Sequence, residues 1–115
     1  QTAGRDVHGL GDWWVAPPGH LNYFSKDTLV NLINGAGYEV CLSEASFPLE
    51  MFLLFNDCYV KNREIGKEIH KKRVNFEMNL RKLGHADKLH EFYQALAKIN
   101  LGRQIAVYAL SSNVK

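Results

Sequence analysis

The amino-acid sequence predicts a mixed α/β (or α+β) fragment with two strands, at about residues 38–43 and 103–110, and about four helices. Two observations favour this class. Apolar residues recur at three- and four-residue steps in several segments, which is typical of amphipathic helices. Two short β-prone segments lie far apart in the chain, and the first directly follows a glycine. Because two strands cannot form a stable sheet with both faces covered, the sheet is expected to need further strands.

The first 24 residues are expected to form a loop or arm, and residues 25–115 the folded region. Ser25 is a suitable N-cap for a helix over residues 26–36, because its hydroxyl can accept a hydrogen bond from a free amide of the first turn. Gly37 is well placed for the left-handed conformation that ends a helix. A strand at about 38–43 then completes a helix–glycine–strand unit.

Three further helices are expected before the closing strand. Pro48 fits the first turn of one that continues over residues 49–59, although this apolar segment would also suit a buried strand. An amphipathic stripe predicts a longer helix over residues 64–83, ended by Gly84. Another helix is expected over residues 86–99.

Composition excludes some classes of protein. The 115 residues are 46% hydrophobic, so a core can form, and the net charge of +2 gives no support for a strongly nucleic-acid-seeking protein. No segment approaches the length of a membrane helix or reads as a signal peptide. The two cysteines, Cys41 and Cys58, form no CxxC pair, which favours a reduced, cytoplasmic location. Cys41 is expected to be a small core residue of its strand.

The most distinctive segment is the loop of residues 13–25, which combines aromatic residues, two prolines, a histidine and an asparagine just ahead of a helix. Such a loop is stiff and can present polar groups at a cleft. The structural alternative is that Tyr23 and Phe24 form a hydrophobic staple onto the helix. Gly35 and Gly37 come at a helix end and ahead of a strand, which is the wrong order for a nucleotide-binding turn.

The loop is the first part of a longer sequence pattern that continues in later segments of the chain. The loop and the strand after it read WW-x-x-PP-x-H-x-NYF and G-[FY]-x-V, at Trp13-Trp14, Pro17-Pro18, His20, Asn22-Tyr23-Phe24 and Gly37-Tyr38-Glu39-Val40. The pattern continues at Phe47-Pro48-Leu49-Glu50-Met51-Phe52-Leu53-Leu54, Gly66, His70, Arg73, Phe76, Glu77 and Leu101-Gly102-Arg103. It resembles the C-terminal part of class I S-adenosylmethionine-dependent methyltransferases of one bacterial group, over almost the whole chain. Gly19 departs from the pattern, which has an acidic residue there.

The resemblance implies a place in a Rossmann-like sheet of seven strands. The strands near Tyr38 and Gln104 would be the sixth and seventh, forming a reversed hairpin at the end of the sheet. The helices between them would cover the substrate side. The complete parent enzyme would use S-adenosylmethionine to methylate a small-molecule acceptor. This chain lacks the glycine-rich turn that binds the cofactor, so it is expected to hold no cofactor and to be inactive alone, with the missing part on the N-terminal side.

The same resemblance and the residue chemistry give candidate site residues. His20 is the best candidate for a general base or an orienting group. The candidate substrate contacts are Trp13, Trp14, Asn22, Tyr23, Glu50 and Arg73. An ion pair between Arg73 and a glutamate that holds helices together explains Arg73 at least as well. No metal site is expected, since His85 and His90 are five residues apart and do not share a helix face.

Two other functions remain open from the sequence. The chain can be a stand-alone binding or assembly module, or a small basic domain for nucleic acid. The latter is disfavoured, because Glu64, Glu68 and Glu77 lie in and around the basic run of residues 67–73, as on a solvated helix face. Two strands with unpaired edges also predict that the isolated chain forms a homo-oligomer.

Overall fold

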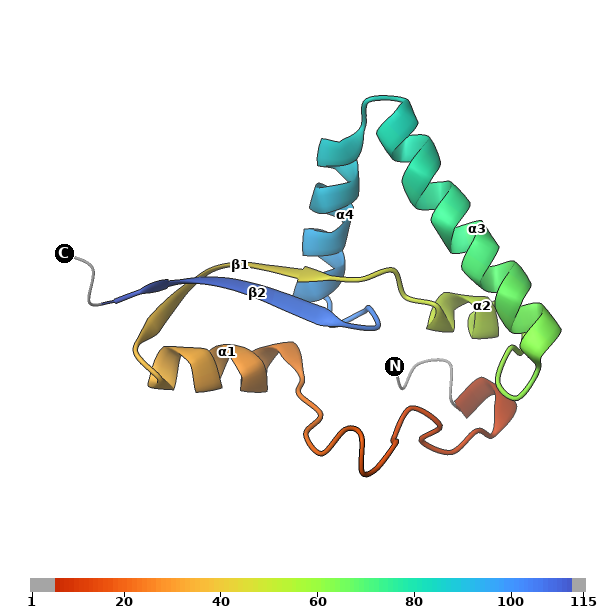
Figure 1. The fold of residues 1–115 in the computed structure, drawn as a ribbon, viewed down its shortest axis with the longest axis horizontal. Coiled ribbons are helices and arrows are strands. Elements are labelled where there is room, and N and C mark those ends of the chain that lie inside the picture. Colours follow the sequence, from red (N-terminus) through yellow and green to blue (C-terminus); the bar gives the residue numbers. More distant parts are fainter. Residues whose placement is uncertain (1–5, 113–115) are drawn as a thin grey trace.

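The computed structural model describes residues 6–112, and over this range the chain forms a two-stranded sheet and four α-helices (Figure 1). The elements are η1 (Asp6–His8), α1 (Lys26–Gly35), β1 (Tyr38–Ala45), α2 (Glu50–Leu54), α3 (Arg63–Lys82), α4 (Ala86–Lys98) and β2 (Ile105–Ser111). The predicted mixed fold class, with two strands and four helices, is confirmed. Residues 1–5 of the expected arm and residues 113–115 of the folded region lie outside the described residues.

The two strands pair antiparallel. The register runs from Tyr38 opposite Ser111 to Ala45 opposite Ile105. Helices α1 and α4 both contact β1, and in Figure 1 they lie on opposite sides of the hairpin. The sheet therefore has a helix on each side, but each helix covers only part of its length.

Helix α1 forms where its caps predict it. The Thr28 amide donates to the Ser25 hydroxyl at 3.3 Å, and the Ser25 amide donates back to the Thr28 hydroxyl at 3.0 Å. After the last turn, Gly37 has a φ of +86°, a left-handed conformation that costs glycine little. The Gly37 amide donates to the Asn34 carbonyl at 3.0 Å. This chain reversal delivers the backbone directly into β1.

The helix expected over residues 49–59 is much shorter in the structure, where α2 ends at Leu54. Asn56 has a left-handed φ of +66°, and the Asp57 amide donates to the Phe52 carbonyl at 2.8 Å. These two features make a helix-ending motif in which asparagine takes the place usually held by glycine. The predicted length was wrong because it relied on apolar residues, which continue past Asn56, whereas the helical backbone conformation ends before this residue.

Helices α3 and α4 form a hairpin with boundaries within one residue of those expected. Gly84 joins them with a φ of +78°, and the His85 amide donates to the Leu80 carbonyl at 2.8 Å. A row of aromatic rings links both helices to the segment before α2. The Phe76 ring lies 5.5 Å from that of Phe47 and 5.9 Å from that of Phe92, with edge-to-face geometry in both pairs.

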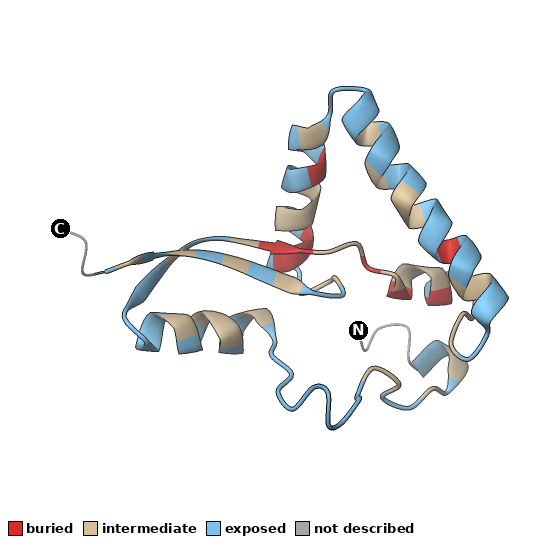
Figure 2. Ribbon diagram, in the orientation of Figure 1, coloured by how far each residue is buried: buried red, intermediate tan, exposed pale blue. Residues whose placement is uncertain are grey.

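The buried core is small (Figure 2). Its apolar members within residues 6–112 are Ala45, Leu53, Ile69, Leu89, Leu96 and Ala97. The accessible surface is 8093 Å², whereas a compact monomer of 13.1 kDa exposes about 6,400 Å². The radius of gyration is 16.3 Å, against about 13 Å for a compact domain of similar length. The chain therefore leaves far more surface uncovered than a complete domain of its size.

Cys41 illustrates this incomplete burial. It lies in β1 as expected, but its side chain is exposed, so the predicted core position is wrong. The register is irregular between Val40, which faces Ala109, and Leu42, which faces Tyr108. Cys41 is the extra residue of this bulge. Among residues 6–112 it has no partner in the register across the sheet, and its side chain is exposed.

Candidate functional site

The loop ahead of α1 is held in shape by its own residues. The Trp13 and Trp14 rings meet edge to face, with centroids 4.8 Å apart. The Tyr23 hydroxyl accepts a hydrogen bond from the Ala16 amide at 2.8 Å and donates to the Trp14 carbonyl at 3.4 Å. Tyr23 thus ties the two ends of the loop together, and the Trp13, Trp14 and Tyr23 predicted as substrate contacts lie in one structured segment.

His20 and Asn22 are exposed polar side chains of this loop. The His20 amide donates to the Ala16 carbonyl at 3.1 Å, which fixes the backbone, while the imidazole makes no hydrogen bond within the described residues. The rings of His20 and Tyr23 are 6.4 Å apart. Tyr23 and Phe24 are each 48% exposed, so neither ring is buried against α1 as a hydrophobic staple. The imidazole is left available to an incoming ligand.

Glu50, a third predicted substrate contact, lies in the first turn of α2 and is only 3% exposed. Its Oε2 atom has no hydrogen-bond partner within the described residues. Burial raises the pKa of the nearby Tyr59 hydroxyl from 10.0 to about 12, and the negative charge of Glu50 acts in the same direction. The positive charge of Arg103 acts against this shift. Glu50 is therefore inside the molecule rather than on a surface that substrate can reach directly.

A pH titration tests the environment of Tyr59. Because its folded pKa is raised from 10.0 to about 12, its contribution to stability is fully present below pH 10 and is lost as the pH rises towards 12. We expect ultraviolet titration of the folded chain to contain a late phenol that Tyr59→Phe removes. Denaturing the wild-type chain should shift that phenol back towards pH 10, and a late phenol that survives denaturation would contradict the assignment.

Arg73, the last predicted contact, belongs to a network that joins α3 to α4. Its Nη1 donates to both carboxylate oxygens of Glu77, at 3.0 and 2.9 Å. The Tyr93 hydroxyl of α4 donates to the same carboxylate. Burial raises the pKa of Tyr93 the most, and this hydrogen bond raises it further. Within residues 6–112, no hydrogen bond, ion pair or ring contact joins Arg73 to Glu50 or to the loop. The geometry thus supports the structural explanation of Arg73.

A second polar cluster, which the sequence did not indicate, lies at the carboxyl end of β1. Glu44 is 9% exposed, and its Oε1 lies 3.0 Å from His90 Nδ1 and 3.4 Å from Gln94 Nε2. A cavity of about 210 Å³ is adjacent, lined by Glu44, Ala45, Ser46, Tyr93, Gln104, Ile105 and Ala106. The four-residue spacing of His90 and Gln94, which puts both on one face of a helix, was the only available signal.

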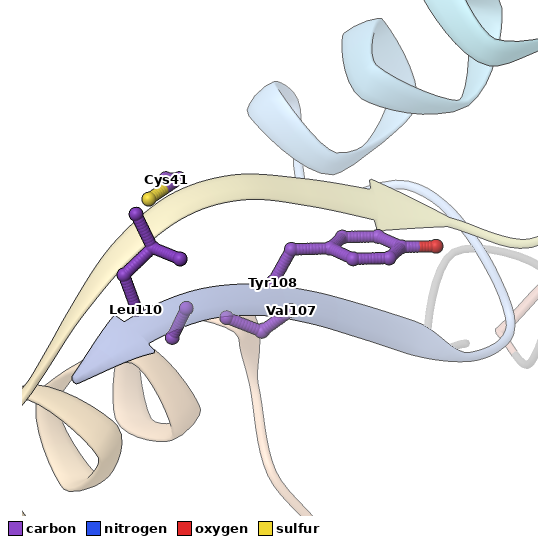
Figure 3. A pocket seen from close by; sticks show the side chains of 5 residues that line it. Cys41, Val107, Tyr108 and Leu110 are labelled. Carbon is purple, nitrogen blue, oxygen red and sulfur yellow. The ribbon is translucent and has the colours of Figure 1, made fainter.

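The sheet carries a larger depression of about 520 Å³ at its other end, over the bulge (Figure 3). It is lined by Cys41, Val107, Tyr108, Ala109 and Leu110. Its wall is mostly apolar, and Tyr108 and Leu110 are 53% and 67% exposed. With no charged group in the wall, this depression offers no means to orient a polar substrate. The Glu44 cavity is the better candidate for chemistry.

Neither a metal-binding cluster nor a membrane-spanning helix is found in the part of the chain that the structure describes. Residues 6–112 contain no group of three or more histidine, cysteine, aspartate or glutamate side chains placed to hold a metal ion. None of the helices in this range combines the length and the apolar character that crossing a bilayer requires. Comparison with known proteins adds no family: no protein-family model, curated protein or solved structure matches this chain.

Proposed function

We propose that this chain is the C-terminal, substrate-side portion of a class I S-adenosylmethionine-dependent methyltransferase, without the half that binds the cofactor. Its sequence pattern, from the tryptophan pair to the last strand, is the basis of the proposal. In this reading the chain alone holds no S-adenosylmethionine and transfers no methyl group. The complete parent enzyme binds the cofactor and methylates a small molecule.

The observation that carries the proposal is the order of elements on the fold. The loop leads directly into α1, α1 leads into β1, and the helices α2, α3 and α4 intervene before β2 returns antiparallel beside β1. An antiparallel strand pair with helices between its strands is compatible with the reversed hairpin and helical insertion that the sequence resemblance implies. The two strands are about 60 residues apart at their closest, so local sequence preferences alone do not bring them together.

The uncovered surface supports an incomplete sheet. Within the described residues β1 and β2 pair only with each other, so each has one open edge. Further strands from a cofactor-binding half would continue the sheet and cover part of the excess exposed area. In the isolated chain the same edges favour pairing between copies, and we propose that it self-associates when expressed alone.

The carboxyl end of β1 is where a ligand of such a sheet would be expected. In open α/β sheets, ligands bind beyond the carboxyl ends of the strands. The carboxyl end of β1 holds Glu44, and the loop ahead of α1 carries His20. His20 is then the group proposed to orient the methyl acceptor or to take its proton.

Reading the coding sequence upstream of Gln1 tests the proposal. We expect it to encode a strand, a glycine-rich turn and a helix, with an acidic residue after the next strand, since close approach to a nucleotide needs these features. A start codon directly before Gln1 would contradict the proposal and favour a stand-alone module.

A further inference from the structure

The cavity beside Glu44 is built around a buried carboxylate that is only half satisfied. Both nearby donors, His90 Nδ1 and Gln94 Nε2, reach the same oxygen, Oε1, at 3.0 and 3.4 Å. The other oxygen, Oε2, makes no hydrogen bond to the described residues. A buried carboxylate is costly unless hydrogen bonds or an opposite charge compensate it. Glu44 therefore keeps one oxygen without a partner among the described residues, and its side chain lines the cavity.

Two of the other polar side chains in the cavity wall, those of Tyr93 and Ser46, are already engaged. The Tyr93 hydroxyl donates to Glu77, so this side chain offers the cavity its ring rather than its hydroxyl. The Ser46 hydroxyl accepts from the Gln104 amide at 2.9 Å. No lysine or arginine is among the lining residues. The wall thus combines one carboxylate, an aromatic ring, aliphatic side chains and the neutral carboxamide of Gln104, and it carries no cationic side chain.

This combination selects a chemical class of ligand. A carboxylate supplies the opposite charge for an ammonium group, and an aromatic ring attracts cations through its quadrupole. The alanines and Ile105 offer apolar surface for methyl groups. The volume of about 210 Å³ limits the ligand to a few heavy atoms or to the head group of a larger molecule.

We propose that the cavity between α4 and the carboxyl end of β1 binds a small organic cation, a primary or methylated ammonium group, with Glu44 as its counter-ion and Tyr93 in its wall. The proposal goes beyond the transferase function and does not depend on it, since the cavity is complete within this chain. If the transferase proposal also holds, the ammonium group becomes a candidate recognition point on the methyl acceptor.

Titration of the whole chain with tetramethylammonium, followed by amide NMR shifts at constant ionic strength, tests this site. We expect saturable shifts at the cavity residues, and none there with tert-butanol, which is of similar size but uncharged. Glu44→Gln should weaken binding by about tenfold or more, because the charge is removed while an acceptor for His90 remains. The matched control is Glu91→Gln, an exposed position of α4 paired with Lys88, which should bind like the wild type.

The outcomes separate cleanly. Equal binding of tetramethylammonium and tert-butanol, shifts located away from the cavity, or no saturable shift with the wild-type chain would overturn the proposal. Unchanged binding in a folded Glu44→Gln chain would overturn it too. If that variant does not fold, the comparison of the two probes on the wild-type chain still decides. None of these results involves S-adenosylmethionine, so they leave the transferase proposal to its own test.

Discussion

Gly102→Ala is expected to lower the free energy of unfolding by about 2–5 kcal/mol, because it combines backbone strain with overpacking. Gly102 has a φ of +147°, a conformation that residues with a side chain rarely adopt. An added methyl group would overlap the Ala45 side chain and lie 3.0 Å from the Ser46 carbonyl oxygen. Ala45 is 2% exposed, so the neighbour cannot move aside without disturbing the core.

Denaturant unfolding measures this effect, with Gly66→Ala as the matched control. Gly66 lies inside α3, where an added methyl group meets nothing within 4 Å. There the same substitution should stabilise the chain by about 0.5–1 kcal/mol, since alanine favours the helix interior. Similar free-energy changes for the two variants would contradict the close approach of Gly102, which precedes β2, to Ala45 at the end of β1.

Leu89→Ala is expected to lower the free energy of unfolding by about 2–5 kcal/mol through loss of buried contacts and the cavity it leaves. The Leu89 side chain is fully buried, at 0% exposed, where α4 meets the rest of the fold. The control is Leu83→Ala, the same chemical change at a side chain that is 71% exposed. It should change stability by less than about 0.5 kcal/mol.

The same denaturation experiment decides between the two leucines. A large loss for Leu89→Ala alone supports a small core concentrated on α4. Equal losses would mean that Leu83 is covered in solution, which self-association of the isolated chain would produce. Repeating the measurement at a lower protein concentration separates association from burial of Leu83 within a single chain, because only association depends on concentration.

Local signals in the sequence predicted helix α1 well. Ser25 caps it and Gly37 ends it, and each effect is contained within a few neighbouring residues. The length of α2 was missed because Asn56 adopts a left-handed conformation, which asparagine tolerates but does not require. The exposure of Cys41 was missed for a different reason, since burial depends on what covers a strand, and among residues 6–112 the side chain at this bulge stays exposed.

The candidate site was only partly predictable. The loop residues from Trp13 to Tyr23 are neighbours in sequence, so their gathering in one segment followed from the pattern. Glu44 and His90 are far apart in the chain and meet only because α4 folds back onto β1. A lone glutamate in a strand and a lone histidine on a helix gave no sign of that pairing. Long-range contacts of this kind need the tertiary fold.

Calorimetric titration of S-adenosylmethionine into this 115-residue chain and into the longer gene product that we propose tests the central claim most directly. We expect no heat of binding from the short chain, because none of the glycines within residues 6–112 lies in a turn between a strand and a following helix, where a nucleotide is held. The longer product should bind. Micromolar binding by the short chain alone would contradict the view that it is the substrate-side part of a larger enzyme.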